Sequence, residues 1–278
     1  MKYTIKALEP FGVLIQALDK DYSVEDISID LLKKYFDQDK LIILRGFKTF
    51  STSTSFANYC ERWGEISVWP FGKVLDLTKH QNPEDHIFDN NYVPLHWDGM
   101  YRPEIPEYQI FHCLNAPAND QGGQTVFSNT SIIIDKAPAE LIDLWKKVNV
   151  RYTRQMEFYN STTFSPLIIK HPYKDKLVIR YNEPPAKDIP DFINPPGIEF
   201  FGIDKNQLET MQLKLQESLH SPEAFYAHTW HNNDIVIADN FTLLHGRQAY
   251  AKKSGRHLQR VHVNSSPKFK NPGLETYL

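Results

Sequence analysis

Apolar residues recur at helical spacing in four stretches of the chain. Apolar positions three and four residues apart form one face of a helix, and that face can pack against a core. Three of these stretches also begin at a residue suited to a first helical turn: Ser23 and Asp204 as caps, and Pro138 at the first position. The predicted helices are Val24–Phe36, Thr54–Trp63, a helix that begins near Pro138, and Lys205–Leu219.

Shorter apolar runs bounded by turn residues predict strands. These runs are Leu41–Arg45, Gln109–Leu114, Gln124–Phe127, Lys176–Tyr181, Ile235–Ala238, Thr242–Gly246 and His257–Asn264. Many short strands, with turn signals between them and helices near the N-terminus, are typical of a β-sandwich or jelly roll. The pattern therefore predicts a mixed β protein with added helices.

The length and composition are those of one folded domain. The chain has 278 residues, of which 41% are hydrophobic and 13% aromatic, and this is ample for a packed core. We find no internal repeat and no low-complexity linker that would divide the chain. We therefore expect one large domain over residues 1–278, with insertions.

Charge and cysteine usage exclude several classes of partner. The formal net charge is −3, and no run of Lys and Arg is dense enough for a nucleic acid or an anionic membrane. The longest aliphatic run, Leu41–Leu44, is far below the roughly 20 apolar residues of a membrane-spanning helix. Only two cysteines occur, and neither lies in a CxxC pair. The N-terminal residues have no sustained apolar stretch, so we expect no signal peptide. We expect a cytoplasmic protein with a small-molecule partner, and the sequence leaves a homo-oligomer open.

The stretch PLHWDGMY places two strong metal ligands, His96 and Asp98, one residue apart. In a strand, alternate side chains share a face, so both would point to one place while Trp97 packs on the other side. Taken alone, this pattern is weak, because an isolated H-x-D is more often a buried histidine beside a surface or capping aspartate.

A third ligand has to come from elsewhere in the chain. His80 and His86 lie in a polar stretch and are expected to be exposed, whereas His112 is expected in the core. His245 differs from them because it ends the apolar run LLHGR and Gly246 lets the backbone come close. Only the fold could unite His245 with the upstream pair.

Two histidines and one carboxylate have two common uses. They form the facial triad of non-haem Fe(II) oxygenases, which leaves three coordination positions open. They also serve zinc hydrolases, but the HExxH helix that usually supplies such ligands is absent. The residues alone keep both metals open and favour iron.

Two candidate anion sites accompany the metal ligands. Arg256 and Arg260 lie four residues apart in GRHLQRVHV, and a guanidinium can grip a carboxylate with two parallel hydrogen bonds. In Gly122–Thr125 (GGQT) a hydroxyl follows two glycines and could reach a carboxylate oxygen. The alternatives are surface arginines and an ordinary glycine turn.

Taken in order, these segments resemble the taurine dioxygenase-like (TauD/TfdA) family of Fe(II)/2-oxoglutarate oxygenases. The resemblance runs through KLIILRGF, FANYCERWGEI, LHWD, GGQTVFSN, NDIVIADNFTLLHGR and RHLQRVHV, and so covers most of the chain. After His245, arginines follow at +11 and +15, which is the spacing in that family. Each segment is modest alone, but their order and spacing are specific.

The resemblance implies a double-stranded β-helix core (jelly roll, cupin-like) with N-terminal helices and a helical insertion, a lid roughly within 128–230. It implies that His96, Asp98 and His245 bind Fe(II), and that O2 and 2-oxoglutarate are cosubstrates. Thr125 and Arg256 would hold the distal carboxylate of 2-oxoglutarate, and Arg260 would face the substrate. Since Asp98 stands where related halogenases lack a carboxylate, we expect no halogenation.

PLHWDGMY and GGQTVFSNT are most similar to a PvcB-like branch of the family. That branch implies oxidation of an isonitrile derivative of tyrosine in secondary-metabolite biosynthesis: desaturation, with or without loss of the carboxylate. Tyr101 is a candidate for the wall of the substrate pocket, or an aromatic packed beneath the lid. Two alternatives stay open, a hydroxylase of another small acid such as a sulfonate or amino acid, and a non-catalytic jelly roll that binds metal or ligand.

Overall fold

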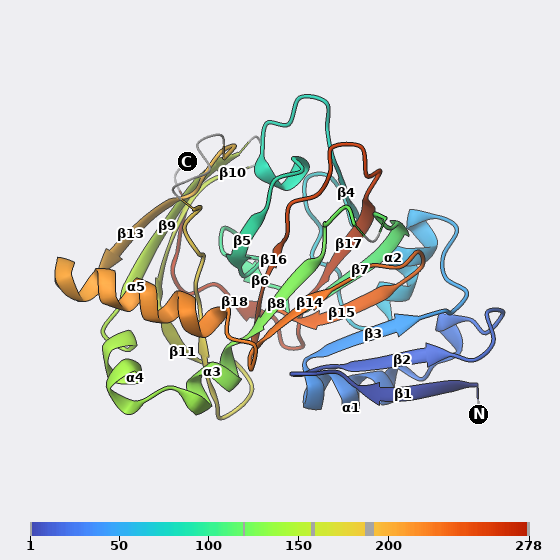
Figure 1. The fold of residues 1–278 in the computed structure, drawn as a ribbon, viewed down its shortest axis with the longest axis horizontal. Coiled ribbons are helices and arrows are strands. Elements are labelled where there is room, and N and C mark those ends of the chain that lie inside the picture. The colour runs from blue at the N-terminus through green and yellow to red at the C-terminus, as the bar shows by residue number, and fades with distance from the viewer. Residues whose placement is uncertain (1, 119, 157–158, 187–191, 277–278) are drawn as a thin grey trace.

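A large sheet and a small sheet make up the centre and the right side of the molecule in Figure 1. The computed structural model describes residues 2–118, 120–156, 159–186 and 192–276. The large sheet has the order β1 (Tyr3–Ala7), β2 (Val13–Ala17), β3 (Leu41–Arg45), β15 (Ile235–Asp239), β7 (Tyr108–Asn115), β17 (His257–Val263), β4 (Leu75–Thr78). Its strands are antiparallel except for the pair β2 and β3.

The small sheet carries much of the chemistry predicted from the sequence. Its order is β14 (Phe225–His228), β8 (Thr125–Asn129), β16 (Leu243–Arg247), β5 (Val93–His96). Apolar side chains of both sheets form one buried cluster, which includes Phe111 and Leu258 of the large sheet and Phe127 and Leu243 of the small one. The two sheets therefore pack on a shared core, as the strand pattern predicts.

A third sheet with helices forms the left side of the molecule in Figure 1. Its order is β13 (Gly197–Phe201), β9 (Asn149–Met156), β10 (Tyr159–Pro166), β19 (Leu274–Thr276). The helices on this side are α3 (Thr130–Lys136), α4 (Ala139–Trp145) and α5 (Lys205–Leu219), and two short pairs are β11 (Ile168–Lys170) with β12 (Leu177–Ile179) and β6 (Glu104–Ile105) with β18 (Phe269–Lys270). The segment 128–230 thus contains strands as well as helices.

Two helices pack against the large sheet: α1 (Ile29–Asp39) lies against β3 and β15, and α2 (Ser53–Glu61) lies against β17. The predicted start of the first helix is wrong. Ser23 caps only a short 3-10 turn, η1 (Val24–Asp26), after which Ile27 is extended. Ser28 then accepts a hydrogen bond from Leu31 N–H and begins α1. Two cap residues five positions apart compete for one apolar pattern, and the pattern does not decide between them.

The prediction for Lys205–Leu219 is confirmed at both ends, and Asp204 and Gln207 form a capping box at its start. Helix α3 was not predicted, because three successive isoleucines give no helical period. Among the helices of the described residues, none combines the length and apolar character needed to cross a membrane.

Candidate metal centre and its cavity

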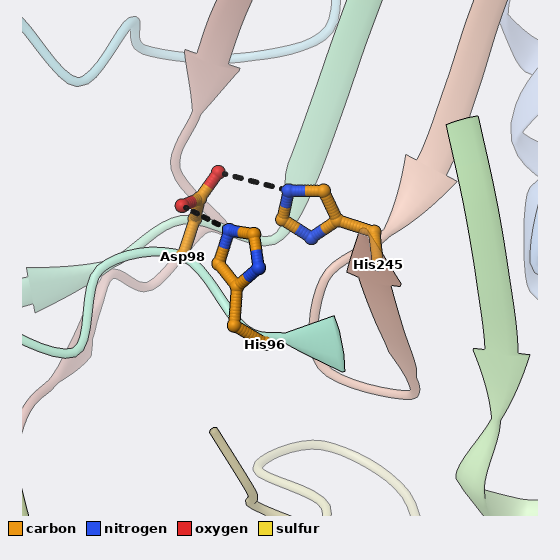
Figure 2. A group of neighbouring side chains, drawn as sticks. All are labelled: His96, Asp98 and His245. Atoms are coloured by element: carbon orange, nitrogen blue, oxygen red, sulfur yellow. Dashed lines mark ion pairs between the residues drawn. The ribbon is translucent and has the colours of Figure 1, made fainter. Parts of the chain in front are cut away.

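His96 and His245 are direct neighbours across the pair of strands β5 and β16. The centres of their imidazole rings lie 4.2 Å apart. Figure 2 shows both rings directed toward the carboxylate of Asp98. The register of the small sheet thus brings together residues that lie far apart in the sequence.

Asp98 reaches this place by a turn and not by the strand that the sequence predicts. Strand β5 ends at His96, and Asp98 lies in the turn that follows. Asn240 holds this turn, because its Oδ1 accepts from Asp98 N–H and its Nδ2 donates to Asp98 O, both over 2.9 Å. Gly99 has φ +90°, and a Cβ there would come within 2.6 Å of Pro106 Cδ. The prediction that both ligands project from one strand is therefore wrong, although their convergence is found.

Trp97 has the packing role expected between the two ligands. Its side chain is buried, and the guanidinium of Arg180 lies 4.8 Å from its ring. Arg180 also donates to Asn240 O over 2.8 Å. Through Arg180, the indole is therefore connected to Asn240, the residue that holds the turn of Asp98.

Three donor atoms converge in the centre. His96 Nε2 lies 3.7 Å from Asp98 Oδ1, and His245 Nε2 lies 3.6 Å from Asp98 Oδ2. Ligand atoms that share one metal at about 2.1 Å lie roughly 3 to 4 Å apart. His96 Nδ1 donates to Pro94 O over 2.8 Å, so its Nε2 presents the lone pair that a metal requires. Spacing, donor types and tautomer fit a divalent metal held by two nitrogens and one oxygen.

The surroundings keep all three side chains in the state that binds a metal. Burial lowers the pKa of His96 and holds that of His245 well below its usual value, so both imidazoles are neutral near pH 7. Burial alone would raise the pKa of Asp98, but the charge of Arg260, followed by His262, holds it well below its usual range. The site therefore needs no proton loss before it binds a metal near neutral pH.

One oxygen of Asp98 is surrounded by three donors, of which the sequence had pointed out only Arg260. Gln109 Nε2, Arg260 Nη1 and His262 Nε2 lie 2.6, 2.7 and 2.8 Å from Asp98 Oδ2. His262 and Gln109 are paired residues of β17 and β7. The two-residue spacing of Arg260 and His262 was a readable signal that they share a face of the strand.

Thr125 and Arg256 meet on the core side of the same assembly. Arg256 Nη2 donates to Thr125 Oγ1 over 3.3 Å, and Trp230 Nε1 donates to the same oxygen over 3.0 Å. Because Thr125 Oγ1 accepts twice, its own proton remains for another acceptor. The register β16–β8 pairs His245 with Phe127, so Thr125 shares a face with His245. Trp230 was not predicted to take part.

The double glycine before Thr125 is more than an ordinary turn. Gly123 has φ +78°, and a Cβ there would lie 2.9 Å from Arg256 Cδ. Arg256 Nε donates to Gly123 O over 2.9 Å. Burial lowers the pKa of Arg256 to about 9, and among the described residues no carboxylate forms an ion pair with it. A buried cation of this kind fits a site for an anion.

A cavity of about 920 Å³, counted to its open mouth, adjoins the metal ligands. His96, Asp98 and Arg260 are among the residues that line it, and Tyr101, whose side chain is 9% exposed, is part of its wall. Its apolar lining comes from Trp69, Phe71, Phe88, Met100, Met156 and Phe192. This lining, apolar with an arginine among its residues, suits a small aromatic molecule with one anionic group.

Residues of the third sheet and of η2 (His86–Phe88) complete the cavity. Arg154 of β9 lies in its wall and forms an ion pair with Asp85 at 2.5 Å. The prediction that His86 is exposed is wrong: it is 6% exposed, and its Nδ1 donates to Ile193 O over 3.1 Å. Asp85 accepts from Ile87 N–H and so begins this turn. The segment 128–230 thus supplies one side of the cavity.

Comparison with known proteins supports the resemblance. The family model described as "Taurine catabolism dioxygenase TauD, TfdA family" matches residues 4–262. A tyrosine isonitrile desaturase of Erwinia amylovora is 42% identical over 264 residues, which is 95% of this chain and 90% of that protein. A 3-((Z)-2-isocyanoethenyl)-1H-indole synthase of Fischerella ambigua is 36% identical over 263 residues, or 94% and 96% of the two chains.

A solved structure agrees in fold and in sequence. It is described as PvcB, an Fe, alpha-ketoglutarate dependent oxygenase from an isonitrile synthetic pathway. The TM-score is 0.84 at 37% identity, over 99% of this chain and 96% of that one. The jelly-roll core with helical additions expected from the sequence is thereby confirmed.

Proposed function

The chain belongs to the TauD/TfdA family of dioxygenases, and from this premise we propose that it desaturates an isonitrile derivative of tyrosine. It is an Fe(II)/2-oxoglutarate-dependent oxygenase, which sets aside the non-catalytic jelly roll and the zinc hydrolase. One observation supports this choice of substrate. The chain is 42% identical to a tyrosine isonitrile desaturase, and the match spans 95% of this chain.

In this proposal His96, Asp98 and His245 hold the Fe(II). The pair Thr125 and Arg256 holds the distal carboxylate of 2-oxoglutarate: the guanidinium supplies charge and the threonine hydroxyl supplies its free proton. When bound, Fe(II) with 2-oxoglutarate and dioxygen supplies a two-electron oxidation. Burial of Arg256 excludes water from this anion site, and this strengthens the attraction between the two charges.

In the proposal two kinds of lining residue place the substrate. Arg260 lines the cavity together with Asp98, to which its Nη1 is bonded, and its other N–H groups would hold a substrate carboxylate. The aromatic and methionine side chains of the lining, with Tyr101 among them, suit a phenol ring. A carboxylate at one end and a ring at the other would hold the intervening carbon chain beside the metal ligands.

Desaturation removes one hydrogen from each of two neighbouring carbons. The balance is one 2-oxoglutarate and one dioxygen consumed, and one carbon-carbon double bond, one succinate, one carbon dioxide and one water formed. The chain contributes position to this outcome: a carbon chain clamped at both ends favours loss of the second hydrogen over hydroxylation. Hydroxylation of another small acid is the competing outcome of the test below.

The test is an anaerobic addition of Fe(II), 2-oxoglutarate and the isonitrile of tyrosine, followed by oxygen. The proposal expects one succinate per desaturated product, whose mass is two hydrogens below that of the substrate. A product heavier by one oxygen would establish a hydroxylase. Succinate formation with a sulfonate or amino acid, but not with the isonitrile, would refute the proposal that the isonitrile is the substrate.

A second substrate, the isonitrile of tryptophan, is favoured by one observation. The similar protein of Fischerella ambigua carries the name of an isocyanoethenyl indole synthase. Such a product has no carboxylate, so its formation would also release carbon dioxide from the substrate. The same assay is run with each isonitrile, and the isonitrile that is consumed is the substrate. The product mass then shows whether the carboxylate was lost, because the decarboxylated product is lighter than the desaturated acid by the mass of carbon dioxide.

A further inference from the structure

A chain of hydrogen bonds runs from the cavity wall to the carboxylate of Asp98. Trp69 Nε1 lies 3.1 Å from His262 Nδ1, and His262 Nε2 lies 2.8 Å from Asp98 Oδ2. An indole N–H can only donate, so His262 Nδ1 must accept. In the neutral imidazole the proton is then on Nε2, which donates to Asp98. Trp69 therefore sets the tautomer of His262.

Trp69 is itself held firmly. Its backbone exchanges two hydrogen bonds with Gly72, over 2.8 and 3.0 Å. Its ring stacks on Phe71, with centroids 5.6 Å apart, and the guanidinium of Arg102 lies 4.6 Å from it. The ring also lines the cavity. The direction of the indole N–H is thus fixed by contacts that do not involve the metal centre.

The donors on Asp98 act on one oxygen only. His262, Gln109 and Arg260 all contact Oδ2, at 2.8, 2.6 and 2.7 Å. His262 thus supplies one of three hydrogen bonds that all draw on the lone pairs of Oδ2. Oδ1 takes part in none of these three contacts and lies 3.7 Å from His96 Nε2. The two oxygens of Asp98 are therefore chemically unequal before any metal binds.

We propose that His262, held in one tautomer by Trp69, is a positioning residue that makes Asp98 a one-oxygen ligand. This rests on the proposed function, in which Asp98 binds Fe(II). His96, His245 and one oxygen of Asp98 would hold the Fe(II) through three atoms and would leave room on it for 2-oxoglutarate and dioxygen. A second oxygen of Asp98 on the Fe(II) would reduce that room.

The arrangement also joins the metal site to the substrate cavity. Trp69 forms part of the wall and the start of the hydrogen-bond chain, so a substrate that packs on the indole contacts the residue that sets the tautomer of His262. Histidine suits the middle position because its two ring nitrogens can accept on one side and donate on the other. An aliphatic residue at this position could do neither.

Two substitutions at His262 separate its hydrogen bond with Trp69 from its hydrogen bond with Asp98. A glutamine amide reaches about as far as Nε2 and can still donate to Asp98, whereas an asparagine amide ends near Nδ1 and can contact only Trp69. His257 offers matched control variants, because it lies on the same strand and its Nε2 also lies 2.8 Å from a carboxylate, that of Asp76. His257→Asn and His257→Gln test the loss of such a pair away from the metal ligands.

The readouts are the Fe(II) dissociation constant, measured anaerobically, and the ligand-field absorption of bound Co(II), which reports its coordination number. We expect His262→Asn to weaken Fe(II) binding on the order of tenfold to a hundredfold and to change the Co(II) spectrum. His262→Gln should restore both toward the parent values, and the two His257 variants should match the parent. Equal behaviour of the Asn and Gln variants, or an Asn variant like the parent, would overturn the proposal.

Two further variants keep the result decisive. If His262→Asn does not fold, Trp69→Phe still tests the proposal, because it removes only the N–H donor that fixes the tautomer of His262. An unchanged Co(II) spectrum in Trp69→Phe would then refute the positioning role. Asp98→Ala tests the proposed function itself. If Asp98→Ala loses Fe(II) binding while His262→Asn binds Fe(II) as the parent does, the positioning role alone is refuted. Full Fe(II) binding by Asp98→Ala would refute the triad.

Discussion

Arg256 Nη2 lies 3.3 Å from Thr125 Oγ1, and this contact joins the loop before β17 to the first residue of β8. The guanidinium is buried and, within the described residues, has no carboxylate partner. These features fit the proposed role of the pair, in which it receives an anion from outside the chain. The first two predictions follow from this contact.

Replacement of Arg256 by lysine should raise the 2-oxoglutarate concentration needed for half-maximal rate by about tenfold to a hundredfold. Lysine keeps the charge but loses the planar fork that can hold two carboxylate oxygens, and one charged hydrogen bond contributes about 1.5–3 kcal/mol. The requirement for the prime substrate should change far less. Initial rates of succinate formation measure both. Arg151→Lys, at an exposed ion pair with Glu199, is the control; an unaltered 2-oxoglutarate requirement would remove Arg256 from its role.

Gly123→Ala should weaken 2-oxoglutarate binding through its effect on Arg256. The new Cβ would lie 2.9 Å from Arg256 Cδ and would displace the guanidinium. Gly46→Ala is a close control, since its φ of +77° matches the +78° of Gly123 while its nearest neighbour is 3.7 Å away. Both variants should lose about 1–2 kcal/mol of stability from backbone strain. Only Gly123→Ala should also need more 2-oxoglutarate, and equal requirements in both variants would contradict this.

His112 should make the metal-free protein less stable as the pH falls from about 6.5 toward 4. Burial lowers the pKa of His112 to about 4 in the folded chain, against about 6.5 when unfolded. In this window the unfolded chain therefore takes up a proton that the folded chain does not. His112→Phe fits between Phe50 and Phe56 and removes this difference. Denaturant unfolding across this range should show a slope shallower by about 1.4 kcal/mol per pH unit in the variant; parallel curves would refute the assignment.

Local patterns account for what the sequence predicted well. Leu41–Arg45 and Lys205–Leu219 are found with the predicted bounds, because a buried run and a capped amphipathic period each lie within one element. His96 and His245 were also singled out from the sequence, and the structure brings them together. The family spacing after His245 pointed to Arg256, which the structure places beside Thr125.

The remaining features depend on contacts between distant segments. The turn that carries Asp98 is held by Asn240, and nothing near Asp98 in the sequence reveals that partner. Gln109 and His262 resemble ordinary strand residues until the pairing of β7 and β17 aims both at one carboxylate oxygen. Sequence patterns pointed to the three proposed metal ligands, but the positions of these supporting residues follow only from the register of the sheets.

The central claim is that His96, Asp98 and His245 together hold one Fe(II). The most direct measurement is the iron content per chain after anaerobic loading and desalting, for the parent protein, His245→Ala and the surface control His257→Ala. The account predicts about one iron per chain in the parent and the control, and little iron in His245→Ala. A His245→Ala protein that is folded and retains the full iron content of the parent would contradict it.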